Sequence, residues 1–215
     1  MSKIFMYVVA RDFGFAPNPF HGFCSLATCK PKIRSKADVG DWIIGIGGSR
    51  LNAAGRCVFA MRVTEKLKFN EYWLNPKYLD KKPIRNGSQK MMVGDNIYYH
   101  DPTDDQWHQA DSHHSYADGS ANLDNLRRDT STENVLISQH FFYFGIDAPQ
   151  IPANILNAIG FKNGIGHRVY EDNVCVGLID WLHNTFGDSL NTVKADPFDF
   201  DKSEARFSTA NNKIS

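Results

Sequence analysis

The chain has 215 residues and a mass of 24.3 kDa, which fits one domain with at most an appendage, because domains usually run about 100–200 residues. Hydrophobic residues make up 42% and charged residues 22%, a composition that excludes a wholly disordered chain. The formal net charge is zero. No apolar run approaches the roughly 18 residues that span a bilayer, and the N-terminus lacks a signal-peptide pattern, so we expect a cytoplasmic protein.

Strands dominate the predicted elements of the first part. Residues 3–10 are aromatic and β-branched and predict an opening strand. Residues 42–46 predict a second strand, and the long apolar run over residues 56–67 a third, joined to the second by a short polar connection that indicates a hairpin. Residues 69–74 predict a helical turn. Two further short strands are predicted later, over residues 134–138 and 141–145.

The stretch from about residue 76 to residue 132 has little apolar periodicity. Loops of this length are usually functional or mobile, and the tyrosines, histidines and Trp107 within it indicate an ordered insertion that forms a site. Residues 153–160 predict a helix, and residues 171–186 carry the 3.6-residue apolar stripe of an amphipathic helix. We therefore predict one α+β domain over residues 1–190, with its strands wrapped into a small barrel, and a polar, flexible tail over residues 191–215.

The zero net charge hides two oppositely charged parts. Residues 1–94 hold 16 Lys and Arg against 6 Asp and Glu, a net charge of +10, and residues 95–215 hold 8 against 18, a net charge of −10. This asymmetry favours a basic surface for an anionic partner such as nucleic acid or a nucleotide. Mutual neutralisation of the two parts inside one fold explains it equally well.

A basic run with period two follows the first loops. In an extended segment these side chains would share one face at a spacing of about 6.6 Å, which suits a row of phosphates. The alternative is a solvated edge strand protected by charge. The run consists of Lys30, Lys32, Arg34 and Lys36.

The second candidate cluster is the sequence Asp111-Ser112-His113-His114-Ser115. Adjacent histidines point to opposite sides in most backbone conformations, so at most one faces a given ligand, and a histidine beside acidic groups acts as a general base near neutral pH. The alternatives are a polar loop that holds its own turns and a metal site. The metal alternative would recruit His100, His108, His113 or His114 with Asp101 or Asp111.

The four cysteines indicate reduced thiols rather than a disulfide framework. Cys57 and Cys175 lie in apolar stretches and are expected in the core, whereas Cys24 is a candidate nucleophile. His21, Cys24 and Cys29 form H-x2-C-x4-C, but no second cysteine pair follows, so a structural zinc is not expected, although a downstream histidine could complete a site. The sequence identifies no cofactor.

Further candidates for ligand binding lie beside polar loops. The segment Gly164-Ile-Gly166-His167-Arg168 combines flexible backbone with two side chains that can grip an anion, although it also suits a loop that enters the last helix. An aromatic side chain such as Phe20, Phe23, Trp42 or Trp107 would stack on a base.

Several long motifs occur in order. They are RDFGFAPNPFHGFCSLATCKPKIR, VGDWIIG, DSHHSYADGS, RDTSTENVLISQHFFYFG and GHR. With these motifs, residues 3–185 resemble the nucleotide modification associated domain 2 family. The resemblance implies a setting in the DNA-modification systems of phages and bacteria, with no assigned reaction to carry over. A likeness at the level of fold, to PUA-like barrels of the EVE type, implies nucleic-acid binding and a pocket for a flipped modified base.

Three functions follow as hypotheses. The first is a module that recognises a modified base and its phosphates in nucleic acid, most of all DNA; its binding residues would be Arg11, Asp12, Phe20, Lys30, Lys32, Arg34, Asp41, Trp42, His167 and Arg168. The second is an enzyme that modifies a base or nucleotide through His113 or His114 with Asp111, and with Cys24 as nucleophile. The third is an interaction subunit of a modification or defence enzyme. None of the three involves a membrane.

Overall fold

The computed structural model describes residues 2–208 and 210–214. The chain forms two compact units, each built from stretches that are separate in the sequence. The first unit comprises residues 2–12, 37–65 and 138–198. The second comprises residues 13–36, 66–137, 199–208 and 210–214.

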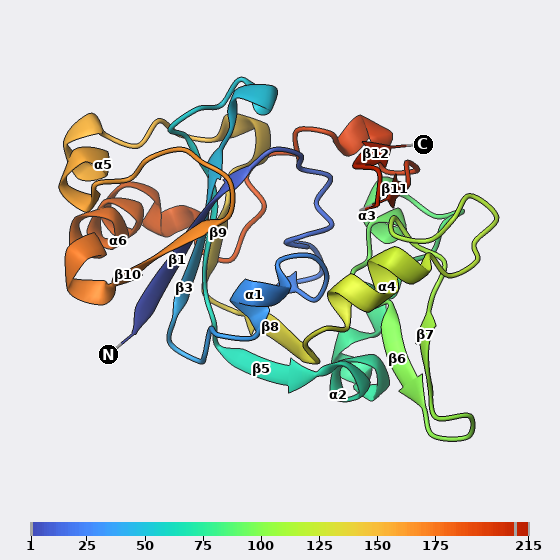
Figure 1. Ribbon diagram of the computed structural model, residues 1–215. Coiled ribbons are helices and arrows are strands. Elements are labelled where there is room, and N and C mark those ends of the chain that lie inside the picture. Colours follow the sequence, from blue (N-terminus) through green and yellow to red (C-terminus); the bar gives the residue numbers. More distant parts are fainter. Residues whose placement is uncertain (1, 209, 215) are drawn as a thin grey trace. The chain divides into compact units, whose positions relative to one another are not determined.

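A five-stranded sheet forms the centre of the first unit, with the strand order β10-β1-β3-β4-β9 (Figure 1). β1 (Lys3–Val9) runs parallel to β3 (Trp42–Gly47) and antiparallel to β10 (His167–Glu171). β4 (Cys57–Arg62) pairs antiparallel with β3 and with β9 (Phe141–Tyr143). The predicted opening strand and the predicted hairpin are thus confirmed.

Apolar side chains cover both faces of the inner strands, and all six residues of β3 are buried. Gly45 of β3 is required by packing, because a Cβ there would collide with the ring of Phe59 on β4. The helices α5 (Ala153–Ile159) and α6 (Asp172–Phe186) lie together near β10 (Figure 1). α6 buries Cys175, Leu178 and Leu182, which confirms the predicted amphipathic helix. The unit also contains the short 3-10 turns η1 (Ser49–Leu51), η3 (Gly145–Asp147) and η4 (Gly187–Ser189).

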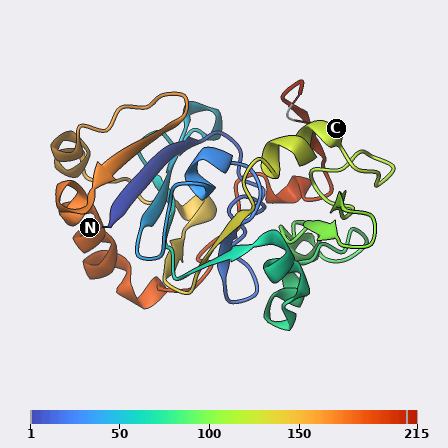
Figure 2. The same cartoon turned by 60° about the horizontal axis from the view of Figure 1, so that its bottom comes forward.

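A three-stranded sheet with the order β2-β8-β5 consists of β2 (Cys24–Leu26), β8 (Asn134–Ser138) and β5 (Glu65–Lys68), and all of its residues except Glu65 and Ser138 belong to the second unit. The other strands of the second unit form two small antiparallel pairs, β6 (Tyr98–Asp101) with β7 (Gln106–Gln109) and β11 (Phe207–Ser208) with β12 (Lys213–Ile214). Figure 2 shows these elements from a second direction.

The helices of the second unit are short. They are α1 (Pro31–Arg34), α2 (Phe69–Leu74), η2 (Pro76–Lys81), α3 (Gln89–Met92), α4 (Leu123–Asp129) and η5 (Phe200–Lys202). The long polar stretch over residues 76–132 therefore contains regular elements, and residues 199–208 of the polar C-terminal segment belong to the same unit.

The α+β class is confirmed, but three finer predictions change. Among the residues described, none of the sheets closes into a barrel, so a PUA-like barrel is not confirmed. The long strand predicted over residues 56–67 is wrong, because β4 ends at Arg62 and β5 begins at Glu65 in a different sheet. The extended basic segment is also wrong, because Pro31–Arg34 is a helical turn, and its side chains do not form one row. No helix in the described part of the chain is long and apolar enough to cross a membrane.

Candidate functional site

A buried polar network in the second unit holds the loop that precedes β2 and the segment that follows it. The Lys81 ammonium is fully buried and donates to the carbonyls of Asn18 and Phe23 and to the Asn18 side chain, at 2.7–2.9 Å. Asp95 accepts from the Ser25 hydroxyl at 2.9 Å and from the Ala27 N–H at 3.3 Å. Because buried polar groups are costly unless paired, this network fixes the path of the backbone up to residue 27.

Cys29 lies two residues further on, in an unusual backbone conformation. Cys29 has φ 56° and Lys30 has φ 41°, two successive non-glycine residues in the left-handed region. Such a conformation costs on the order of 1–3 kcal/mol and persists only where the surroundings enforce it. Pro31 then begins α1, where its fixed φ suits the first helical position. The turn projects the half-buried Cys29 side chain at the start of this helix.

The buried Arg34 guanidinium fastens this turn to the end of α4. It donates to the Cys29 carbonyl at 2.9 Å, to the Asn134 carbonyl at 2.7 Å and to the Asp129 carbonyl at 2.5 Å. The Cys29 N–H in turn donates to Oδ1 of Asp129 at 2.8 Å. Two segments about a hundred residues apart in sequence are therefore held in one rigid frame.

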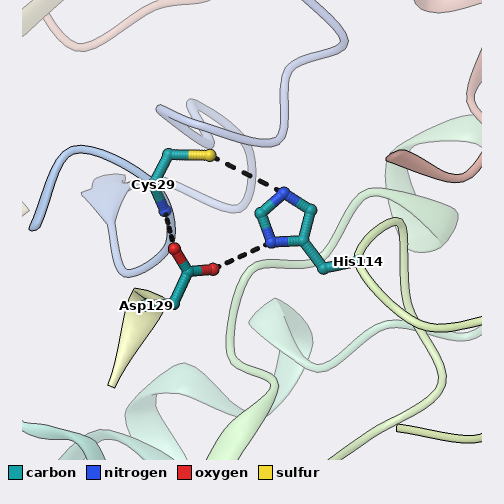
Figure 3. Close-up of side chains that lie close together, drawn as sticks. All are labelled: Cys29, His114 and Asp129. Carbon is teal, nitrogen blue, oxygen red and sulfur yellow. Dashed lines mark hydrogen bonds and ion pairs between the residues drawn. The ribbon is translucent and has the colours of Figure 1, made fainter. Parts of the chain in front are cut away.

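His114 contacts both Cys29 and Asp129, and together with the Cys29 N–H on Asp129 these contacts form a closed group (Figure 3). Its Nε2 lies 3.6 Å from the Cys29 sulfur, and its Nδ1 donates to Oδ2 of Asp129 at 2.8 Å. Tyr98 also donates its hydroxyl to Oδ2 of Asp129, at 3.0 Å. The His114 backbone is held by Asn125, whose amide donates to the His114 carbonyl at 2.7 Å. All of these residues belong to the second unit.

The charges of this group favour a protonated His114. Burial alone would lower the pKa of the His114 imidazole, but the neighbouring Cys29 and Asp129 raise it to about 10. Burial likewise favours a neutral Asp129, yet His114, Arg34 and Tyr98 together lower the pKa of its carboxyl. The arrangement therefore favours an imidazolium between a carboxylate and the sulfur of Cys29.

The adjacent His113 lies in a different environment. Its Nδ1 donates to the Ala205 carbonyl at 2.6 Å, and its ring packs against Phe13 and Phe15, with centroid distances of 4.5 and 5.1 Å. Burial and the charge of His114, together with Arg85 and Arg206, lower the pKa of His113 to about 3. His113 is thus a neutral side chain of the core.

The ligand atoms of Cys29, His114 and Asp129 all lie within 4.8 Å of one another, so the group is also a candidate metal centre. However, Asp129 contacts Nδ1 of the ring and Cys29 faces Nε2. The two ring nitrogens point in divergent directions, so one ion cannot take all three ligands while these contacts persist. An ion on the sulfur and Nε2 would have two protein ligands, fewer than the three or four of protein zinc sites. The geometry suits a nucleophile and its base better.

The structure separates the acid–base and nucleophile candidates that the sequence suggests. Cys24 is fully buried in β2, and its neighbour Ser25 contributes to the Asp95 network. Asp111 is exposed and forms an ion pair with Arg206, and it also accepts from the Ser115 hydroxyl at 3.0 Å. Of the candidates Cys24, Asp111, His113 and His114, His114 is the one that belongs to the Cys29–His114–Asp129 group.

The suggested ligand-binding residues lie in both units. In the first unit, Asp12 accepts from Tyr143 and from the Phe198 N–H, and Asp41 accepts from the N–H groups of Lys3 and Asp38, so both stabilise the backbone locally. The others in that unit are the half-buried Arg11 and His167, the buried Trp42 and the exposed Arg168. In the second unit, Phe20 stacks on Phe200 and Arg34 binds carbonyls, whereas Lys30 is half-buried and Lys32 exposed.

Sequence reasoning did not single out Cys29 as a nucleophile, nor Asp129 and Tyr98 as its supports. One local signal was present: a cysteine two residues before a proline that can begin a helix, in the segment Thr28-Cys29-Lys30-Pro31. Asp129 had no comparable signal, because its role depends on contacts with residues distant in sequence.

A cysteine, a histidine and a carboxylate in mutual contact are the residue types that form the nucleophile, base and orienting carboxylate of cysteine-dependent enzymes. The family model for the nucleotide modification associated domain 2 matches residues 1–204, and the chain belongs to that family. This membership associates it with nucleotide modification systems. No curated protein and no solved structure matches the chain.

Proposed function

We propose that the protein is an enzyme of a nucleotide modification system that uses Cys29 as a nucleophile in acyl transfer. The observation that carries the proposal is the position of His114, which faces the Cys29 sulfur with Nε2 and the Asp129 carboxylate with Nδ1, at separations of 3.6 and 2.8 Å. In this proposal Cys29 is the nucleophile, His114 is a base that also acts as an acid, and Asp129 is the carboxylate that orients the base, as in other triads of this kind.

Each residue has a defined step in this reaction. The Cys29 thiolate attacks a carbonyl carbon and forms a thioester, while the bond from that carbon to the leaving group breaks. His114 donates its Nε2 proton to the leaving group. Water or an acceptor amine or hydroxyl then attacks the thioester and gives its proton to His114, and the C–S bond breaks to restore the thiolate. Asp129 holds the ring by its Nδ1–H throughout.

The setting of Cys29 supports this proposal over a structural role. Strained backbone is concentrated at active sites, and Cys29 and Lys30 form the one adjacent pair of non-glycine residues with positive φ among those described. Cys29 is half-buried, whereas Cys24, Cys57 and Cys175 are buried. We therefore expect a reagent from solvent to reach Cys29 more readily than the other three thiols.

The test is formation of a thioester with an activated ester such as p-nitrophenyl acetate. We expect a burst of p-nitrophenol equal to the enzyme concentration and one acetyl group on Cys29 by peptide mass mapping. Cys29→Ser should abolish the burst, and Cys24→Ala, the matched control at a buried cysteine, should retain it. Acetylation spread over surface lysines, with no burst, would refute the nucleophile.

A second function, the recognition of nucleic acid without chemistry, is favoured by the net charge of +10 on residues 1–94. We also propose that the protein works in the DNA-modification or defence systems of phages and bacteria, because its sequence resembles a family with that setting. A reader would bind oligonucleotides with an affinity that falls steeply with salt, and Cys29→Ser would bind as well as the parent. An enzyme would lose its turnover in the same variant.

A further inference from the structure

We propose that His140 and His183 bind a tetrahedral Zn²⁺ ion through their Nε2 atoms. These two atoms lie 3.3 Å apart, on half-buried side chains of the first unit. His140 lies in the turn between β8 and β9, and His183 lies in the last turn of α6. The Cys29–His114–Asp129 group belongs to the second unit, so this metal site is independent of the proposed function.

The separation of the two rings matches a shared ion. A tetrahedral ion with Zn–N bonds of about 2.05 Å holds the two nitrogens about 3.3 Å apart and, given the size of an imidazole, the ring centroids about 5.2 Å apart. A straight hydrogen bond of the same length would put the centroids about 5.6 Å apart. The centroids of His140 and His183 are 5.1 Å apart, which agrees with two rings that are tilted toward one ion.

The surrounding structure holds both rings in place. The His140 N–H donates to the Ser138 hydroxyl at 3.0 Å, and the His140 carbonyl accepts from that hydroxyl at 2.9 Å and from the Arg62 N–H at 3.0 Å. His183 lies on α6, whose apolar face is buried. Trp42 packs edge-on against both imidazoles, with centroid distances of 5.4 and 6.0 Å. The two ligands are therefore positioned before an ion arrives.

The charges around the pair leave a lone pair available for a metal. Burial and the charges of His183 and Arg62 lower the pKa of the His140 imidazole. A neutral imidazole offers the nitrogen lone pair that a metal needs, whereas an imidazolium has none. Arg62 is exposed, so solvent and salt screen its repulsion of a bound cation.

The donor set and its geometry select the ion. Imidazole nitrogens suit Zn²⁺, Cu²⁺ and Ni²⁺, whereas Mg²⁺ and Ca²⁺ prefer oxygen ligands. A square-planar Cu²⁺ or Ni²⁺ ion needs neighbouring nitrogens about 2.9 Å apart, closer than the 3.3 Å observed. Two protein ligands leave two positions of a tetrahedral ion to water or a small molecule, so we expect weaker, exchangeable binding than in a closed structural zinc site.

The first experiment is a calorimetric titration with Zn²⁺ at neutral pH. It uses the full chain with Cys29→Ser, so that the Cys29 sulfur cannot bind the ion. We expect one Zn²⁺ per chain with a micromolar Kd, and His140→Gln or His183→Gln, added to Cys29→Ser, should each weaken binding by about tenfold or more. His108→Gln, the matched control at a half-buried histidine of the second unit, should leave the affinity unchanged. An unchanged affinity in both His140→Gln and His183→Gln, or no binding at millimolar Zn²⁺, would overturn the site.

A second experiment uses the parent protein and does not depend on how the variants fold. Diethyl pyrocarbonate modifies neutral imidazoles, and peptide mass mapping gives the rate at each histidine. Zn²⁺ should protect His140 and His183, and Mg²⁺ should not. Modification of both residues at the same rate with and without Zn²⁺ would show that the pair forms only a hydrogen bond, and would contradict the proposed ion.

Discussion

Replacing the Asp129 carboxylate with an amide should disable the site and destabilise the fold. The carboxylate accepts three hydrogen bonds, from the Cys29 N–H on Oδ1 and from His114 and Tyr98 on Oδ2. In Asp129→Asn, one oxygen becomes an NH2 group. Whichever way the amide turns, its NH2 faces at least one buried donor, so the variant cannot reproduce the three bonds.

The expected loss follows from that count. An unsatisfied buried donor costs about 1–3 kcal/mol, and removal of one partner from a buried ion pair costs about 3–5 kcal/mol. These terms overlap, so we expect the free energy of unfolding to fall by about 3 kcal/mol or more, measured by denaturant titration. Cys29 alkylation should also slow, because His114 loses the carboxylate that holds its ring by Nδ1.

Asp111→Asn is the matched control, since it makes the same chemical change at an exposed carboxylate paired with Arg206. It should cost less than about 1 kcal/mol, as surface ion pairs do. If Asp129→Asn unfolds at the same denaturant concentration as the control and keeps the parent's alkylation rate, the assignment of Asp129 as the orienting carboxylate is wrong.

Three further variants test the same frame. His114→Gln removes an imidazole whose pKa rises from 6.5 to about 10 on folding; the part of the stability difference that comes from this ionisation should be full below about pH 6.5 and be lost as pH rises through about 10, and denaturation at several pH values checks it. Tyr98→Phe removes one bond to Asp129 and should cost about 1 kcal/mol, with slower Cys29 alkylation. Lys81→Met leaves the Asn18 and Phe23 carbonyls without their donor and should cost about 3 kcal/mol in denaturant titration; a cost near zero would show that the network does not hold the Cys29 segment.

The first unit was the more predictable from sequence. Residues 4–9 form a continuous apolar run, residues 42–47 contain only apolar residues and glycines, and α6 has a 3.6-residue stripe, so local patterns define these elements. The second unit is harder, because Arg34, Lys81 and Asp95 are polar residues that lie in its interior. A sequence pattern predicts polar residues in loops or on the surface, and it does not reveal the buried backbone and side-chain groups that pair with them.

The candidate site was predictable only in part. The pair His113-His114 drew attention as adjacent histidines, and the structure gives them different environments. Cys29 and Asp129 lie 85 and 15 residues from His114, and only the fold brings them together. The prediction of an extended basic run was wrong because Pro31 begins a helix. In this helix the Arg34 side chain is buried in the core, whereas Lys30 precedes the helix and directly follows Cys29.

The rate of Cys29 alkylation by iodoacetamide tests the central claim most directly. Because Nε2 of His114 faces the Cys29 sulfur at 3.6 Å, His114→Gln should clearly slow the labelling of Cys29. His108→Gln, at a half-buried histidine outside the group, should leave the rate unchanged. An equal labelling rate in the parent and in His114→Gln would contradict the pairing of Cys29 with His114 and, with it, the proposed nucleophile.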